Sequence, residues 1–285
     1  MEKHLFYLNE EKTATLECFI LAKSHEMPIA DIRPAVVVCP GGGYWFCSDR
    51  EAEPVALAYS GDGFHSFIVR YSVNEKAVFP TPLVELSKAI KIIRENADDW
   101  GVDKEKIAVC GFSAGGHLTA SLGVHWNNPE VMEKSDCKNG ENKPNALILG
   151  YPVISTSWIE NAKTLDRIIG DRDYDSTYEM LNLHLHIGKH TPPSFLFHTV
   201  MDDAVPVRDS LNFAAGLDKN DVLFEMHIFP NNRHGLSLAT DILCEGKGDK
   251  DFSKWHKMSC DWLWRMFYGK EKELQLTKAK YSSKF

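Results

Sequence analysis

Gly111-Phe112-Ser113-Ala114-Gly115 is the stretch that indicates the fold, and it directly follows the apolar run Lys106-Ile107-Ala108-Val109-Cys110. A Gly-x-Ser-x-Gly pentapeptide between a short buried strand and a helix predicts a tight turn that lifts a serine hydroxyl above a sheet. The outer glycines let the strand and helix backbones approach each other, and the turn strains the serine between them. The stretch therefore predicts Ser113 as a nucleophile whose partners lie elsewhere in the chain.

Strands and helices alternate along the rest of the sequence. Strands are expected at 4–8, 14–22, 35–39, 66–71, 107–110, 146–150, 194–198 and 223–229. Helices are expected at 51–60, from 81 or 82 to about 97, from the turn at Ser113 to about 124, at 207–219 and at about 252–268. Runs that are apolar on both faces suit central parallel strands covered by helices. This order predicts an α/β fold with a doubly wound, mainly parallel central sheet and helices on both faces.

The 285 residues are expected to form a single domain, residues 1–285. Residues 127–144 are polar and are interpreted as a surface loop. Residues 155–190 have no clear strand character, and an insertion at this point is a possible cap over the site. The tail at about 269–285 is polar and lysine-rich, and we expect it to fray.

Composition and charge exclude several classes of protein. The net charge of −8 argues against nucleic acid or an anionic membrane as the main partner. No apolar run approaches ~18 residues, and the charged start Met1-Glu2-Lys3 does not match a signal peptide, so we expect no membrane span and a cytoplasmic protein. The seven scattered cysteines contain no Cys-x-x-Cys pair and are interpreted as reduced thiols.

Two regions after later strands offer partners for Ser113. A serine hydroxyl needs a base within hydrogen-bond reach, and His234 lies in a polar loop after the last predicted strand. An acid must then hold the histidine tautomer and stabilise the imidazolium. Asp202 and Asp203 both follow the strand at 194–198, and the residues alone leave the choice between them open. Carboxyl ends of parallel strands are where active sites lie in such sheets.

The run Pro40-Gly41-Gly42-Gly43-Tyr44 offers backbone N–H groups for a developing oxyanion. We expect Gly42, Gly43 and Ala114 to supply these donors, each of which costs ~3–4 kcal/mol when removed. A phosphate-binding loop is disfavoured because no Gly-Lys-Ser/Thr follows and position 46 is Phe. His184-x-His186 lacks a recognisable ligand set, so we predict no metal and no organic cofactor.

Together these residues resemble the α/β-hydrolase superfamily, and within it the acetylxylan-esterase-like branch of carbohydrate esterases, which is related to hormone-sensitive-lipase-like esterases. The resemblance covers about residues 30 to 265 and is carried by the stretches 39–44, 50–54, 107–118, 150–154, 191–194, 202–206 and 233–235. It implies Asp202 as the triad acid through the pattern Asp202-x-x-Val205-Pro206. The chain departs from the branch at Met201, where an acidic or polar residue is common, and from the related lipases at Pro40, where they have histidine.

The resemblance implies a serine carboxylesterase that hydrolyses short-chain esters, most of all acetyl esters, of a small molecule or an acetylated sugar such as a xylo-oligosaccharide. The expected triad is Ser113, Asp202 and His234. Aromatic side chains near these residues are candidates for the substrate pocket: Tyr44, Trp45, Phe112 and Tyr151. One alternative is a serine peptidase of the prolyl-oligopeptidase type, although the chain has no room for the large extra domain. The other is a non-catalytic binding protein, although all three triad candidates are present.

Overall fold

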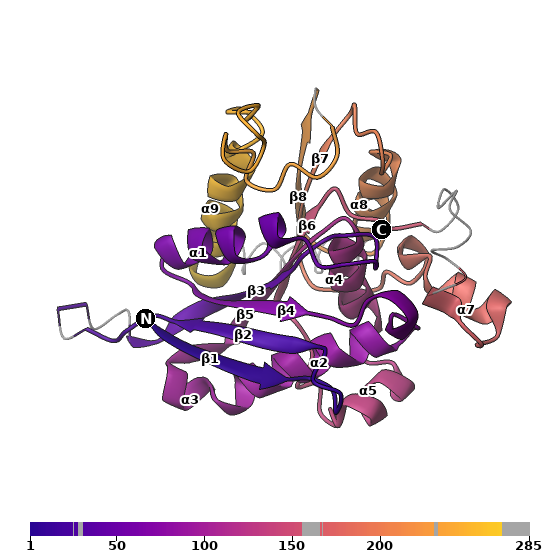
Figure 1. Ribbon diagram of the computed structural model, residues 1–285, viewed down its shortest axis with the longest axis horizontal. Helices are drawn as coiled ribbons and strands as arrows, with labels where there is room; N and C mark the ends of the chain where they lie inside the picture. Colours follow the sequence, from indigo (N-terminus) through magenta and orange to yellow (C-terminus); the bar gives the residue numbers. More distant parts are fainter. Residues whose placement is uncertain (25, 28–30, 156–165, 167, 231–232, 270–285) are drawn as a thin grey trace, which may run out of the picture.

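The computed structural model describes residues 1–269 except 25, 28–30, 156–165, 167 and 231–232 (Figure 1). The described strands are β1 (Glu2–Tyr7), β2 (Thr15–Ile20), β3 (Arg33–Cys39), β4 (His65–Arg70), β5 (Val102–Phe112), β6 (Ala146–Gly150), β7 (Ser194–Thr199) and β8 (Phe224–Phe229). They form an eight-stranded sheet in the order β1-β2-β4-β3-β5-β6-β7-β8. The strand β5 begins five residues earlier than predicted, and the other strand ends lie close to the predicted ones.

Pairing in the sheet is mainly parallel. The strands β1 and β2 form an antiparallel hairpin at one edge, and β2 pairs antiparallel with β4. From β4 through β3, β5, β6 and β7 to β8, every pair is parallel. Parallel neighbours need crossover connections, which helices provide here. The doubly wound, mainly parallel sheet predicted from the sequence is therefore confirmed.

Helices cover both faces of the sheet (Figure 1). The larger described helices are α1 (Glu53–Gly61), α2 (Thr81–Glu95), α4 (Ala114–His125), α8 (Arg208–Lys219) and α9 (Lys254–Tyr268), and a short α3 (Ala97–Trp100) follows α2. Side chains of β3 alternate between the two faces. Val36 and Val38 belong to the same buried cluster as Trp255 of α9, whereas Val37 belongs to the cluster that contains Leu86 of α2 and Leu122 of α4.

A short helix lies where the polar composition predicted only a loop. The helix α5 (Pro129–Ser135) interrupts the segment 127–144. The Asn128 side chain accepts hydrogen bonds from the N–H groups of Glu130 and Val131, and Pro129 occupies the first helical turn. Asn at the N-cap followed by Pro is a helix-start signature. The prediction of a loop was wrong because overall polarity does not report this local capping.

The segment 155–190 contains α7 (Tyr174–Met180) and a 3-10 turn at Leu183–Leu185, while 156–165 and 167 lie outside the described residues. The Arg172 guanidinium donates two hydrogen bonds of 2.9 Å to the Glu130 carboxylate of α5. The carbonyl of Met180 bonds His125, and the carbonyl of Leu181 bonds His117, both on α4. The described end of this segment is thus fastened to the helix that follows Ser113.

These contacts predict that mild acid weakens the fold. Burial lowers the pKa of both His117 and His125 to about 4, so both rings are neutral at pH 7 and donate from Nε2 to the carbonyls. The unfolded chain titrates near 6.5 and binds more protons than the folded chain below that pH. Their contribution to the free energy of unfolding is therefore fully present above pH 6.5 and decreases toward pH 4, by up to about 1.4 kcal/mol per pH unit for each ring.

Urea unfolding at pH 7.5, 6.5, 5.5 and 4.5 measures this dependence. His125→Gln keeps an N–H donor for the Met180 carbonyl but does not titrate. We expect the variant to lose less stability than the wild-type protein between pH 6.5 and 4.5. Equal slopes for the two proteins would show that His125 does not contribute to the acid sensitivity.

Candidate active site

Ser113 stands at the turn between β5 and α4, with φ 53° and ψ −118°. Positive φ is uncommon for a residue with a side chain and marks stored strain. The turn is fixed by backbone bonds: the Ser113 N–H donates to the Gly150 carbonyl at 3.0 Å, and the Ser113 carbonyl accepts from Val153 at 3.2 Å. Neighbouring strand β6 and the residues after it thus hold the serine in place.

The two outer glycines of the turn are required by close packing. A Cβ atom at Gly111 would overlap the carbonyl oxygen of Gly115, and a Cβ atom at Gly115 would overlap the carbonyl oxygen of Cys39 at the end of β3. Any side chain at either position would push the helix away from the sheet. The pentapeptide therefore forms the tight strand-to-helix turn that its sequence predicts.

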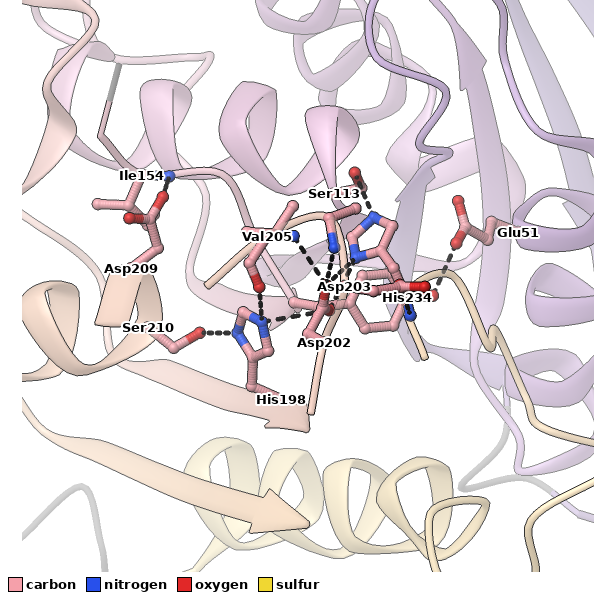
Figure 2. A network of polar contacts seen from close by, with 12 residues as sticks. Glu51, Ser113, Ile154, His198, Asp202, Asp203, Val205, Asp209, Ser210 and His234 are labelled. Carbon is pink, nitrogen blue, oxygen red and sulfur yellow. Dashed lines mark hydrogen bonds and ion pairs between the residues drawn. The ribbon is translucent and has the colours of Figure 1, made fainter. Parts of the chain in front are cut away.

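The His234 ring lies between Ser113 and Asp202 (Figure 2). Its Nε2 is 2.8 Å from Ser113 Oγ, and its Nδ1 is 2.8 Å and 3.0 Å from the two carboxylate oxygens of Asp202. An ionised carboxylate only accepts hydrogen bonds, so Nδ1 carries the proton and Nε2 is free to accept from the serine hydroxyl. This is the arrangement in which an imidazole can take the serine proton.

Asp202 is the more enclosed of the two acids, with 1% of its side chain exposed. Its Oδ1 accepts the backbone N–H groups of Ala204 at 3.0 Å and Val205 at 2.7 Å. Burial alone would raise the pKa of Asp202, but hydrogen bonds from His198 and His234 and the backbone hold it well below its usual range. The carboxylate therefore stays ionised at neutral pH. Its contribution to the free energy of unfolding is fully present above the unfolded-state pKa of about 3.9 and decreases as the pH falls toward the lower pKa of the folded state.

Asp203 takes a different position in the same loop. Its Oδ1 accepts the backbone N–H of His234 at 2.9 Å and does not contact the imidazole nitrogen that faces Asp202. His198, the other histidine beside Asp202, is fully buried and held in place, with Nδ1 2.8 Å from Ser210 Oγ and Nε2 2.9 Å from the Val205 carbonyl. The choice that the sequence left open is answered geometrically: Asp202 bonds the ring, and Asp203 bonds the main chain of the histidine loop.

The glycine loop after β3 lies against the same serine. Gly42 and Gly43 line the cavity beside Ser113, as does Ala114. The loop is held by bonds from Trp45 N–H to the Gly42 carbonyl at 2.9 Å and from Ser48 N–H to the Gly41 carbonyl at 2.9 Å. Ala114 is the first residue of α4, where backbone N–H groups have no partner within the helix. These positions are suited to donating to an oxyanion, which is the role predicted for them.

A buried carboxylate that sequence reasoning missed supports this loop. Glu51 ends the 3-10 turn at Asp49–Glu51 and is 3% exposed. Its Oε2 accepts a hydrogen bond from the Gly41 N–H at 2.8 Å, and its Oε1 accepts one from the Tyr151 hydroxyl at 2.6 Å. Glu51 lies in the stretch 50–54 that contributes to the family resemblance, but neither that resemblance nor the local pattern assigns it a role, because a glutamate in the charged run before α1 is more often solvated.

A cavity of about 370 Å³ opens beside Ser113 and His234. Its remaining walls come from several segments and are largely apolar: Tyr44, Phe46, Val153, Ile168, Leu181, Ala204 and Val205. The polar side chains of Ser48, Arg50 and Glu51 also line it. Ile168 and Leu181 belong to the segment predicted as a possible cap, so its described part contributes to the cavity. His117 also lines it, with Nδ1 accepting from the Tyr44 hydroxyl at 2.9 Å.

The predicted pocket residues fall into different places. Tyr44 lines the cavity, while its neighbour Trp45 is 40% exposed and is not among the lining residues. The structure corrects the prediction at Phe112 and Tyr151, which are buried and do not line the cavity. Phe112 packs edge-on against Trp255 on the α9 face of the sheet, and the Tyr151 hydroxyl is taken by Glu51. The sequence places an aromatic residue near a strand end but does not fix the face to which it points.

Among the described residues, Asp62, His256 and Cys260 are close enough together to be considered as metal ligands, and they lie at the end of α1 and on α9, outside the cavity. Among all the residues that the structure describes, no helix has the length and apolar character needed to cross a membrane.

Comparison with known proteins places the chain among esterase-like sequences. The sequence model of the BD-FAE family matches residues 26–217, which include Ser113 and Asp202. Endo-1,4-beta-xylanase B of Butyrivibrio fibrisolvens is 33% identical over 229 residues, covering 78% of this chain and 35% of that protein. The chain thus spans about a third to a half of the length of the curated relatives it matches.

Two solved structures show the same architecture over nearly their whole length. MGS-M1, an alpha/beta hydrolase enzyme from a Medee basin deep-sea metagenome library, is 35% identical with a TM-score of 0.76, covering 93% of this chain and 98% of that one. An acetyl ester-xyloside bifunctional hydrolase from Caldicellulosiruptor lactoaceticus is 31% identical with a TM-score of 0.79, covering 93% and 97%. These matches confirm the predicted α/β-hydrolase fold and the resemblance to esterases of that superfamily.

Proposed function

Because the chain belongs to the BD-FAE family, we propose that it is a serine carboxylesterase that hydrolyses short-chain esters, most of all acetyl esters, with Ser113 as the nucleophile. The observation that carries this proposal is the continuous chain of contacts from Ser113 Oγ through the His234 ring to the Asp202 carboxylate. A serine hydroxyl in that setting is activated by a base whose tautomer is already correct. The glycine loop and Ser113 line the same cavity.

Acylation begins when an ester carbonyl lies between Ser113 Oγ and the glycine loop. His234 Nε2 accepts the hydroxyl proton as Oγ attacks, and Asp202 stabilises the imidazolium that forms. The oxyanion accepts hydrogen bonds from the N–H groups of Gly42, Gly43 and Ala114. When the tetrahedral intermediate collapses, the C–O bond to the alcohol breaks and His234 returns its proton to the leaving oxygen.

Deacylation repeats the same proton transfers with water. Water gives a proton to His234 Nε2 and attacks the acyl carbonyl, and the oxyanion again occupies the glycine loop. Collapse breaks the bond to Ser113 Oγ, which recovers its proton from His234. The products are one carboxylic acid and one alcohol, and no metal or organic cofactor takes part in these steps.

The cavity and the relatives support an acetylated sugar as the substrate. Tyr44 and His117 are hydrogen-bonded to each other and form a fixed wall of a small, largely apolar cavity. Phe46 and Trp45 are exposed aromatic rings on the glycine loop, and Phe46 lines the cavity. Aromatic faces suit sugar rings. Because similar proteins are named for xylanase and for acetyl ester-xyloside hydrolysis, acetylated xylo-oligosaccharides are the class proposed.

Hydrolysis of 4-nitrophenyl acetate, butyrate and octanoate, with acetate release from acetylated xylo-oligosaccharides in parallel, tests this function. We expect the highest kcat/KM with the acetyl ester, a decrease along the acyl series, and acetate release from the sugar. Aryl-ester turnover without acetate release would contradict the sugar substrate. Absence of turnover with every ester would contradict the esterase function.

A further inference from the structure

Glu51 occupies a position that the catalytic steps above do not use. Its carboxylate is buried and contacts two segments that carry active-site groups. Gly41, which donates its N–H to the Glu51 carboxylate, directly precedes the two glycines proposed to bind the oxyanion. Tyr151, whose hydroxyl it accepts, packs edge-on against the His234 ring, with 4.9 Å between ring centroids. Both contacts thus point toward groups that take part in the proposed reaction.

The direction of the hydrogen bonds fixes the form of this carboxyl group. The Ser237 N–H donates to the Tyr151 oxygen at 2.9 Å, so the tyrosine proton points toward Glu51. The Gly41 N–H donates to the other oxygen. Both partners are donors and neither offers an acceptor to a carboxyl proton, so these contacts favour the ionised form, and 2.6 Å is typical of an O–H group bonded to a carboxylate. Burial raises the pKa of Glu51, and the bonds from Tyr151 and Gly41 partly offset that rise.

The same contacts join loops that are far apart in sequence. Ser237 lies in the loop that carries His234, and its hydroxyl also donates to the carbonyl of Arg50, the residue next to Glu51. Gly41 belongs to the loop after β3, and Tyr151 follows β6. The Glu51 carboxylate therefore accepts a hydrogen bond from the glycine loop and, through Tyr151, is linked to the loop that carries His234, called the histidine loop below.

We propose that Glu51 is a positioning residue for the hydrolysis proposed above, because it holds the glycine loop and the histidine loop around Ser113. Its negative charge also favours the protonated form of His234, which appears during each half of the reaction. The inference rests on the proposed function. Glu51 also lines the cavity, and the contacts that carry the inference are those with Gly41 and Tyr151.

Several ionisable groups face these residues. Asp202 bonds the His234 ring directly and Asp203 bonds its main chain, so both favour the imidazolium as well. Around Glu51 lie Tyr151, His234 and the exposed Arg50, together with the buried side chains of Tyr71 and Cys110. Burial raises the pKa of Tyr71 and of Cys110 well above their ordinary values, so these groups stay neutral and do not replace the charge of Glu51.

Glu51→Gln is the direct test, because the amide has nearly the same shape but cannot accept at both ends. We expect kcat for 4-nitrophenyl acetate to fall about 10- to 100-fold, which is less than the roughly 10²- to 10³-fold cost of removing an oxyanion donor, because the donors are displaced rather than lost. KM should change by less than about threefold, because ground-state contacts with the ester remain. In a plot of kcat/KM against pH, the acid limb, where activity falls with decreasing pH, should move to lower pH, since losing a negative charge near His234 disfavours the imidazolium.

Matched variants separate this role from simple loss of stability. Glu53→Gln makes the same change at an exposed carboxylate two residues away and should leave kcat unchanged. Glu85→Gln removes another buried carboxylate, which bonds Ser72 and lies outside the cavity, and should lower the melting temperature without moving the acid limb. Tyr151→Phe keeps the ring on His234 and removes the hydroxyl; it should lower kcat as well, and it serves if Glu51→Gln does not fold.

Labelling of Ser113 by an alkyl fluorophosphonate is the second readout, because it needs no ester substrate. Slower labelling of Glu51→Gln and Tyr151→Phe than of the wild-type protein supports the proposal. Wild-type kcat, acid limb and labelling rate in both variants would overturn it. A wild-type protein that is labelled at Ser113 but hydrolyses no ester would contradict the proposed function instead, and the labelling rates would still decide the role of Glu51.

Discussion

Replacing Ser113 by alanine is expected to lower kcat for 4-nitrophenyl acetate by a factor on the order of 10⁶. The variant loses the atom that forms the acyl-enzyme, so only hydrolysis assisted by the glycine loop and by binding remains. That residual rate is expected to exceed the uncatalysed reaction by about 10³- to 10⁴-fold. Because Ser113 sits at strained φ and ψ angles that alanine must also adopt, the melting temperature should change little. Steady-state kinetics over a wide range of enzyme concentration measures the loss.

Ser121→Ala is the matched control for this variant. Ser121 lies on the same helix, and its buried hydroxyl has no hydrogen-bond partner among the described residues. Removing that hydroxyl should leave kcat within about twofold of the wild-type value, because it leaves no donor or acceptor unpaired. Loss of less than about tenfold in Ser113→Ala would mean that another group is the nucleophile.

Replacing Asp202 by asparagine is expected to lower kcat by about 10⁴-fold, because an amide no longer holds the imidazole in the tautomer that accepts from serine. The loss should appear in kcat rather than in KM, since Asp202 does not touch the ester in the proposed mechanism. Kinetics at pH 7 to 9 measures it, where the wild-type carboxylate is fully ionised.

Asp203→Asn is the companion experiment, and its outcome should be different. An asparagine oxygen can still accept the His234 backbone N–H that Asp203 accepts now. We therefore expect a loss of less than about tenfold. If the two variants exchanged their effects, the assignment of the acid would be reversed, and equal small losses would show that neither carboxylate supports the histidine as proposed.

The sequence predicted those features that depend on local chemistry. Ser113 was found because glycine, strand and helix signals coincide around it, and the parallel strand order places strand ends at one edge. The structure brings Ser113, Asp202 and His234 together there. Their predicted catalytic roles, and those of Gly42, Gly43 and Ala114, remain proposals, and the variants above test the roles of Ser113 and Asp202.

Other features depend on contacts that no local pattern reports. Glu51 is buried where the loop after β3 and the residue after β6 both donate hydrogen bonds to it, and these contacts join segments far apart in the sequence. Phe112 and Tyr151 are predicted pocket residues, but they lie in the buried cluster that contains Trp255, because the face to which a residue at a strand end points is set by the packing of the whole sheet. The helix α5 was missed for the opposite reason: its capping signal is local but short.

Trapping the acyl-enzyme tests the central claim most directly. The wild-type protein is mixed with excess 4-nitrophenyl acetate, quenched in acid within the first turnover, digested, and analysed by mass spectrometry. The account predicts an acetyl group on the peptide that contains Ser113, and none on that peptide in His234→Ala, which lacks the base. An acetyl group on another residue, or turnover with Ser113 never acetylated, would contradict it.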